Sequence, residues 1–493
     1  MTRRQRLTLI AAILGSAVAM IDGTIVNVAL PAVQRDLGGG LAAQQWVTNA
    51  YLLTLGALLL TGGSLGDIFG ARRIFVAGLA GFGLLSLLCA AAPTIETLIA
   101  ARTLQGVAGA LLTPSSLAVI VAAFPEHERG AAIGSWTAWS GIAVVVGPLA
   151  GGEIVDVSSW RWIFAVNVPL VVATIALVNA GVGGRPARSR RPVDAVGAAL
   201  CVLGLAGVVF ALIEQPRLGI DSPWIVAGLA SGALLLALFV AWERRSRSPM
   251  VPLRMFRRRN FSVTNLETLV VYGALSGLFF FLVIYLQQVA GYSALESGLA
   301  TLPTTIVMFL LSRRVGVLAM RRGPRLFMAA GPLVAAAGAL LLLRLGRHPS
   351  YGLDLLPALV VFSLGLAATV APLTTTVLAD AGEEDAGIAS GINNAVARVA
   401  GLVAVAGIGA VASAQLRHDT FVADAASVRA FHTALAICAA LLAVGGVCAA
   451  LGIRNPARGP ARLPASEPEP TGAGRAAPPG PEAAPRRSAD ASG

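Results

Sequence analysis

Long apolar segments, separated by short polar ones, follow one another along nearly the whole chain. Each is about twenty residues long, which is enough for a helix to cross the ~30 Å hydrocarbon core of a bilayer. Fourteen can be recognised, at residues 7–30, 44–66, 73–92, 95–122, 131–155, 162–182, 194–214, 223–242, 261–287, 297–316, 326–345, 354–379, 386–412 and 430–453. The pattern predicts an all-α membrane protein with fourteen transmembrane helices, and the even number places both termini on one side.

The composition agrees with this pattern. Of the 493 residues, 56% are hydrophobic and 13% are charged, which is too apolar and too poor in charge for an ordinary soluble domain. We therefore expect membrane lipids to surround the chain.

The arginines indicate the orientation in the membrane, because basic residues in short loops remain on the cytoplasmic side. With the N-terminus inside, the inner loops hold 22 arginines and the outer loops hold seven. Both termini of this multi-pass protein are therefore expected in the cytoplasm, with the plasma membrane as its location. The net charge of +12 lies mainly on the inner face, where anionic lipid headgroups supply the counter-charge. It indicates no nucleic acid partner.

Two loops that are eight segments apart resemble one another. "GGSLGDIFGARR" and "VGVLAMRRGPR", aligned on Gly70 and Gly323, both give a helix end, a glycine turn and a basic patch. This similarity predicts that a six-helix bundle occurs twice, with two extra helices between the two copies. The expected parts are a six-helix half at 1–184, two additional helices and a basic loop at 185–258, a second six-helix half at 259–453, and a disordered cytoplasmic tail, rich in Pro, Ala and Gly, at 454–493.

Six motifs, in order along residues 1 to about 453, resemble those of one family of transporters. They are "IDGTIVNVALP", "GSLGDIFGARR", "ARTLQGVAGALLTP", "GIAVVVGPLAGG", "SSWRWIFAVNVP" and "YLQQVAGYSALESGLATLP". The chain resembles a fourteen-helix member of the major facilitator superfamily, in its drug:proton antiporter branch. This resemblance implies the major facilitator fold, with two six-helix halves and two extra helices, and export driven by protons.

One acid and one base lie inside apolar segments at similar depth. At ~1.5 Å per residue, Asp22 is about 8 Å from the outer edge of the first segment and Arg102 about 10 Å from the outer edge of the fourth. A charge that faced lipid would cost several kcal/mol, so such residues usually face a partner or a water-filled cavity. Asp22 and Arg102 are therefore either a proton-coupling pair or a structural ion pair. In the resembled family the basic residue of the fourth-helix motif is implicated in proton transfer.

Three polar residues within the segments are candidates for substrate binding. Asn27 belongs to the first-helix motif, and Gln105 shares one small, polar face with Arg102, Gly106 and Gly109. For the glycines, helix packing alone explains the pattern equally well.

Glu267 is the third candidate, about 9 Å from the inner edge of the ninth segment. It could attract a cationic substrate or bind a second proton, but it could equally reach inner water or pair with an arginine.

Two groups of residues are candidates for conformational gating. In the fifth segment, Gly147, Gly151 and Gly152 surround Pro148, a combination that permits close helix contact and bending. The resembled antiporters carry this motif on their fifth helix, where it is associated with export.

The second gating group is the loop of Asp67, Gly70, Arg72 and Arg73, a charge cluster that could tie helix ends together and hold one access state closed. The family usually has basic residues at the positions of Ile68 and Ala71, so the tie is expected to be weaker or rewired, and the alternative is a solvated loop.

Two further charges have no assigned role. Arg398 lies about 18 Å into the thirteenth segment, a depth that requires a partner or a cavity. Glu153 lies near the outer end of the fifth segment and is expected to reach the interface.

These features favour a proton-coupled exporter of hydrophobic or cationic drugs, antibiotics or toxic metabolites. The open alternatives are an exporter of one endogenous metabolite or lipid, and a receptor that transports nothing. The sequence contains no lysine for a phosphate-binding loop, and its four histidines and four cysteines form no catalytic or metal-binding pattern. We therefore expect no enzyme, no metal and no cofactor other than protons as the coupling ion, in a protein that acts as a monomer.

Overall fold

The computed structural model describes residues 1–182, 193–381, 385–416 and 419–455, and every regular element in this part of the chain is helical. Fourteen of its segments are long and apolar enough to cross a membrane, which confirms the predicted number. The helices extend past the apolar segments: the first runs over Arg3–Leu37, with its N-terminus capped by the Thr2 side chain. Residues 183–192, before the two additional helices, and nearly all of the predicted tail lie outside the described residues.

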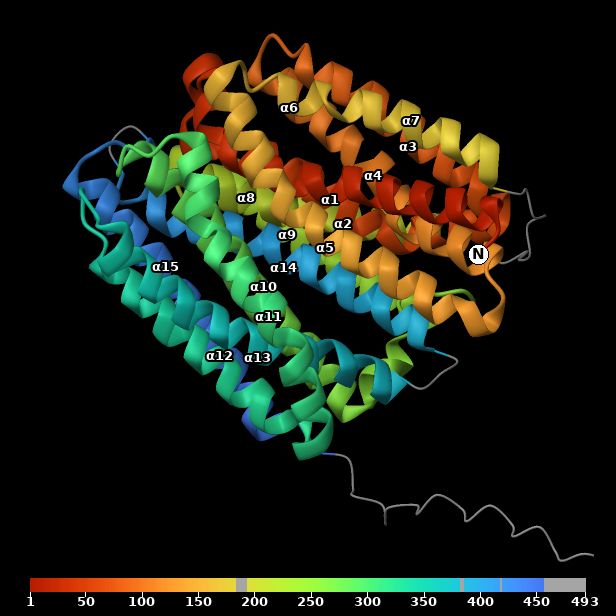
Figure 1. The fold of residues 1–493 in the computed structure, drawn as a ribbon. Helices are drawn as coiled ribbons and strands as arrows, with labels where there is room; N and C mark the ends of the chain where they lie inside the picture. Colours follow the sequence, from red (N-terminus) through yellow and green to blue (C-terminus); the bar gives the residue numbers. More distant parts are fainter. Residues whose placement is uncertain (183–192, 382–384, 417–418, 456–493) are drawn as a thin grey trace, which may run out of the picture. The chain divides into compact units, whose positions relative to one another are not determined.

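Six spans form a first bundle, drawn in red to yellow in Figure 1. They are α1 (Arg3–Leu37), α2 (Gly40–Phe69), α3 (Ala71–Ala90), α4 (Ile95–Ala123), α5 (Glu126–Val157) and a sixth span that is divided into α6 (Trp162–Ala165) and α7 (Asn167–Gly181). Within this bundle α2 packs along α4, and α1 packs against α5, α7 and α4. This packing brings polar side chains of α1 and α4 together in the interior.

Six spans also form a second bundle, drawn in green to blue. They are α10 (Arg259–Gln288), α11 (Ala294–Arg322), α12 (Pro324–Leu341), α13 (Leu356–Ala381), α14 (Ala386–Ser413) and α15 (Ala425–Gly452). Here α11 packs along α13, and α10 packs against α14 and α15. These are the pairings that a repeat of the first bundle gives. The predicted boundaries between the parts stay a prediction, and residues Met1–Asn455 form one compact unit.

The two bundles meet through two main helix pairs. The second helix of the first bundle, α2, packs along α14, and the second helix of the second bundle, α11, packs along α5. In both pairs, the second helix of one bundle packs against the fifth helix of the other. The two contacts are therefore equivalent in the repeat.

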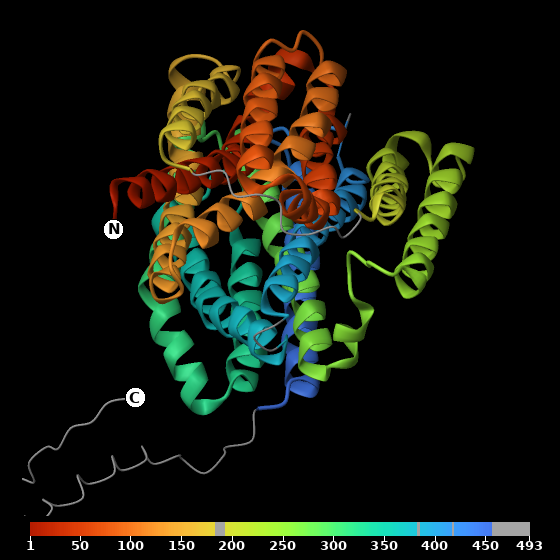
Figure 2. The ribbon, with the colours of Figure 1, turned by 90° about the vertical axis from the view of Figure 1, so that its right-hand side faces the viewer.

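The two additional helices, α8 (Ala195–Leu218) and α9 (Pro223–Arg245), pack mainly against each other. Figure 2 shows them at one side of the structure, with α8 the nearer to the two bundles. The inner helix α8 contacts both α2 and α14, and Trp46 of α2 donates a 2.9 Å hydrogen bond to Glu214 of α8. The pair thus lies beside one of the two helix pairs that join the bundles.

The two loops that resemble one another in sequence also share a backbone conformation. Gly70 has φ +93° and Gly323 has φ +94°, in the region that favours glycine. Each glycine ends one helix, donating its N–H to the carbonyl four residues earlier, and begins the next helix. The predicted glycine turn is confirmed at both positions.

Replacing Gly106 of α4 by Ala should destabilise the protein by about 1–3 kcal/mol, because overpacking forces backbone to move. A Cβ at this position would lie 2.1 Å from Oγ1 of Thr54 and 2.4 Å from the Tyr51 carbonyl oxygen, both on α2. Gly134→Ala on α5 is the matched control, since a Cβ there meets nothing within 4 Å. Thermal unfolding in detergent should separate the two variants; equal midpoints would show that α2 and α4 do not pack this closely.

Candidate functional site

The two opposite charges that the sequence places at similar depth form an ion pair. Nη1 of Arg102 on α4 lies 2.5 Å from Oδ2 of Asp22 on α1. The Asp22 side chain is 0% exposed and that of Arg102 is 1% exposed. The pair is therefore sealed inside the first bundle, where its Coulomb attraction is much stronger than in water.

Amide side chains complete the hydrogen bonds of the carboxylate. Gln105 donates to Oδ1 of Asp22 at 3.2 Å and accepts from Nη1 of Arg102 at 2.7 Å. Asn167 of α7 lies 3.4 Å from the same Oδ1, and Ser86 of α3 contacts both amides. One polar cluster thus ties together α1, α3, α4 and α7.

Aromatic rings surround the guanidinium of Arg102. Its Cζ lies 4.1 Å from the ring centroid of Tyr51 and 5.7 Å from that of Phe164, distances at which a cation is attracted to a ring face. Its Nε donates to the carbonyl of Val47 at 3.3 Å. The guanidinium is held as firmly as the carboxylate.

Sequence reasoning identified Asp22, Arg102 and Gln105 but missed Ser86 and Asn167. Asn167 is the polar residue of "FAVNVP", within the fifth of the six motifs, and could have been found as a buried amide in an apolar segment. Ser86 gave no such signal, because serine is common in membrane helices. Gln105 was a candidate for substrate binding, and in this conformation its polar atoms are occupied by the cluster.

The other predicted substrate-binding residues lie in different surroundings. Asn27 is partly exposed on α1, and none of the hydrogen bonds among the described residues involves it. Glu267 of α10 is 0% exposed, and neither carboxyl oxygen has a hydrogen-bond partner in the described part of the chain. Glu267 therefore neither reaches inner water nor pairs with a described arginine. A carboxyl group in this setting is far more stable when neutral than when charged.

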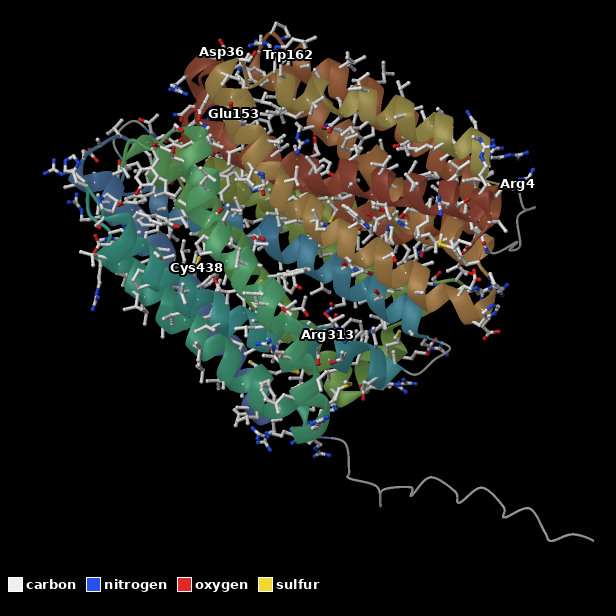
Figure 3. The ribbon with its side chains drawn as sticks, viewed as in Figure 1. Arg4, Asp36, Glu153, Trp162, Arg313 and Cys438 are labelled. Carbon is white, nitrogen blue, oxygen red and sulfur yellow. The ribbon has the colours of Figure 1, made fainter. Side chains whose placement is uncertain are left out.

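The charges without an assigned role also differ in exposure. Glu153 is exposed, and Figure 3 shows it near the end of the structure that carries Asp36 and Trp162, whereas Arg4 lies at the opposite end of α1. Arg398 is partly exposed on α14, and it packs against Gly56 of α2. It forms no ion pair with any described acid.

The loop motif does not form a charge tie in this conformation. Asp67 is exposed and makes no ion pair with a described residue. Arg72 instead donates a 3.0 Å hydrogen bond to Asn179 of α7, within the first bundle. Arg73 is exposed. Whether this loop acts as a gate stays a prediction.

The glycines around Pro148 lie where helices approach closely. Cβ atoms at Gly147 and Gly151 would lie 2.1 Å and 2.3 Å from side-chain atoms of α1, and one at Gly152 would lie 2.6 Å from Cα of Leu295 on α11. The motif therefore allows α5 to contact α1 and the second bundle at once. Towards its N-terminus α5 is less enclosed: Cβ atoms at Gly130, Gly134 and Gly141 would meet nothing within 4 Å.

Two carboxylates join the bundles at their outer ends. Asp156, at the end of α5, accepts hydrogen bonds from the backbone N–H groups of Ala294 (3.0 Å) and Leu295 (2.8 Å) in the first turn of α11. Asp419 lies in the loop after α14. Its backbone carbonyl accepts a hydrogen bond from the Leu41 N–H (2.7 Å), and its carboxylate accepts one from the Ala42 N–H (3.2 Å), both in the first turn of α2. We call these two sites the outer clamps. They occupy corresponding places in the repeat, since Asp156 joins the last turn of the fifth helix of the first bundle, and Asp419 the loop after the fifth helix of the second, to the start of a second helix.

Three glutamines add hydrogen bonds near the outer clamps. Gln45 donates to the Val405 carbonyl at 2.6 Å, Gln287 donates to the Val28 carbonyl at 2.9 Å, and Gln288 donates to the side chain of Gln34. In the described part of the chain, every hydrogen bond between the two bundles lies in the outer half. The structure is therefore closed at the end of the bundles that the sequence predicts to face outside, and Asp22 and Arg102 lie deeper than the residues that close it.

The family of the chain follows from comparison with known proteins. Residues 12–405 match the model of the Major Facilitator Superfamily. The chain belongs to this superfamily. The fold agrees, because a solved bacterial homologue of the human lysosomal transporter Spinster, in an inward-facing and unoccupied conformation, superposes with a TM-score of 0.68 over 92% of this chain and 97% of that chain, at 14% identity.

Several relatives within this superfamily are similar in sequence over most of the chain. The puromycin resistance protein pur8 of Streptomyces alboniger is 40% identical over 408 residues, covering 81% of this chain and 80% of the relative. The multidrug resistance protein Stp of Mycobacterium tuberculosis is 36% identical over 417 residues (84% and 77%). The tetracenomycin C resistance and export protein of Streptomyces glaucescens is 34% identical over 415 residues (83% and 76%).

Breaking the Asp22–Arg102 pair on one side should be strongly destabilising. Arg102→Gln leaves a buried carboxylate without its counter-charge and should cost about 3–5 kcal/mol, whereas adding Asp22→Asn should recover much of this loss. The more exposed pair of Arg161 and Asp36, whose side chains are 36% and 46% exposed, is the control, with an expected coupling below about 1 kcal/mol. Thermal unfolding of the single and double variants measures both couplings, and equal values would mean that the buried pair is not ionised.

Removing an outer clamp should favour the conformation that is open to the outside. A carboxylate at a helix N-terminus contributes about 1 kcal/mol, so Asp156→Ala or Asp419→Ala should raise the open-to-closed ratio about fivefold. Burial raises the pKa of the Asp419 carboxyl, although the hydrogen bond from Ala42 opposes this rise and Glu214 adds to it. Because the charge itself is disfavoured there, Asp419→Asn should retain most of the closure.

The ratio can be measured as a distance distribution between spin labels at Ala91 and Arg347, which are exposed in outer loops of the two bundles. Glu153→Ala, near the Asp156 clamp, is the control. Unchanged distances in both clamp variants would show that the clamps do not hold the bundles together.

Proposed function

We propose that this chain is a proton-coupled antiporter that exports small hydrophobic molecules, including antibiotics, by alternating access. The relatives named for puromycin resistance, multidrug resistance and tetracenomycin C export support this proposal. The proposal includes a location in the cell membrane, with both termini in the cytoplasm, and action as a monomer. It needs no cofactor other than the proton.

The buried Asp22–Arg102 pair carries the proposal. A carboxylate that is 0% exposed can gain or lose a proton only when the helices around it move, so its protonation is linked to conformation. In the outward-closed state Asp22 is stabilised as an anion by Arg102, Gln105 and Asn167. This is the state in which an antiporter has delivered its proton and accepts cargo from the cytoplasm.

We assign the uptake of the next proton to the conformation that is open to the outside. When the outer clamps release, the region above Asp22 opens and a proton from outside neutralises the carboxylate. Arg102 then loses its counter-charge, although Gln105 and the ring of Tyr51 still contact it. The protonated cluster is less tightly joined, and closing the outer side again returns the proton towards the cytoplasm.

Asp22→Asn should abolish proton-driven export, because the amide keeps the shape of the site but carries no titratable proton. Since the variant also leaves Arg102 without its counter-charge and should be less stable, export is normalised to the folded protein recovered by size exclusion. The test uses the full chain in proteoliposomes, with tetracenomycin C as the probe, and follows probe movement together with internal pH. Exchange of probe between the two sides without a proton gradient should persist in the variant.

Glu153→Gln is the matched control, since this acid is exposed on α5. Equal proton-driven export by wild type and Asp22→Asn would remove Asp22 from the mechanism. Probe movement without any proton movement in the wild type would contradict antiport itself.

A further inference from the structure

Arg398 is a charge at membrane depth for which the proposed mechanism has no use. It is the thirteenth residue of α14 (Ala386–Ser413), so it lies about 18 Å from the inner end of this helix. Its side chain is partly exposed, and no described residue forms a hydrogen bond or ion pair with it. A guanidinium that faced lipid at this depth would cost several kcal/mol, so its exposed part faces the space between the bundles.

The neighbours of Arg398 locate this space. Its Cβ lies in contact range of Gly56 on α2, and two residues further along α14 the Ala400 carbonyl oxygen lies in contact range of Gly273, the chain neighbour of Tyr272 on α10. Arg398 therefore stands where α14 of the second bundle meets α2 of the first. Tyr51, whose ring covers the guanidinium of Arg102, lies on the same helix, α2, as Gly56.

Arg398 is accompanied by other polar groups. Tyr272 is the fourteenth residue of α10 (Arg259–Gln288) and hence at nearly the same depth, and no described residue receives or donates a hydrogen bond at its hydroxyl. Asn394 lies one turn before Arg398 on the same face of α14. It is exposed, and its amide nitrogen donates only to the Ser390 carbonyl in its own helix. Three side chains within about one helical turn in depth thus have polar groups with no described partner outside their own helix.

Among the residues that the structure describes, no acid compensates the charge of this group of donors. Asp22 is paired with Arg102 and buried, and Glu267 is buried without contact to any charged group in the described residues. We propose that Arg398, with Tyr272 and Asn394, forms an anion-binding subsite of the transport pathway and selects compounds that carry a carboxylate or an ionised phenol on an apolar ring system. This inference rests on the proposed function for its role in transport, but the subsite itself can be tested without transport.

The chemistry of the donors explains the class of ligand. A guanidinium binds a carboxylate through two parallel N–H donors, and the phenol of Tyr272 can donate a third hydrogen bond. The rest of such a compound is apolar, as pockets for small molecules usually require. A cationic compound meets an uncompensated positive charge and is repelled.

The test measures the electrostatic potential beside Arg398 with a cysteine at Asn394. The full chain carries Asn394→Cys, with Cys201 and Cys448 replaced by Ala, since these two native cysteines are partly exposed whereas Cys89 and Cys438 are buried. The purified protein is labelled with an anionic and a cationic methanethiosulfonate reagent of similar size, in the presence of Arg398 and in the Arg398→Gln variant.

Two unit charges about 6 Å apart in water attract or repel enough to change each rate about threefold. The ratio of the anionic to the cationic rate should therefore fall about tenfold in Arg398→Gln and remain high in Arg398→Lys. No labelling by either reagent, or a ratio that does not depend on Arg398, would overturn the subsite.

A protection experiment tests the class of ligand with two compounds that differ only in charge. 2-Naphthoate should slow labelling at Asn394→Cys, and 2-naphthylmethylammonium should not. The protection should disappear in Arg398→Gln. Protection by the cation, or by neither compound, would contradict selection of aromatic acids. Because no step requires transport, a failure of export in vesicles leaves these results interpretable.

Discussion

The structure depends on one constraint: the Asp22 carboxylate, which is 0% exposed, must have its charge compensated by groups in direct contact with it. An unpaired ion in a low-dielectric interior costs far more than the few kcal/mol by which a folded protein is stable. Arg102 supplies the charge, and Gln105, Asn167 and Ser86 supply the remaining hydrogen bonds. Four helices must therefore keep fixed positions around Asp22, which is possible only because residues such as Gly106 let α4 approach α2 closely.

The same constraint connects the site to the outer closure. Protons cannot reach Asp22 through packed side chains, so a change of its charge requires the helices above it to separate. Asp156 and Asp419 hold those helices at two equivalent places, each by hydrogen bonds to the first turn of a helix in the other bundle. Since backbone N–H groups donate these hydrogen bonds, the clamps depend on the position of the helix ends more than on the side chains opposite them.

The sequence predicted most of the fold, because fourteen apolar segments and the distribution of arginine are strong signals for membrane helices. It also predicted that Asp22 and Arg102 lie at similar depth, since rise per residue converts position into depth. It could not show that they are in contact, because depth says nothing about the face of a helix. The outer clamps could not be predicted either: an aspartate at the end of a helix is common, and only the three-dimensional arrangement shows which helix begins beside it. For Glu267, the sequence left four alternatives, and burial removes both inner water and an ion pair with a described arginine.

The central claim is that Asp22 changes its protonation when the outer side opens. Infrared difference spectra, recorded between protein held closed by a cross-link across the outer ends and protein allowed to open at low external pH, measure this directly. A carboxylic acid C=O band should appear on opening and be missing in Asp22→Asn. The same band in the variant, or no band in the wild type, would contradict the account.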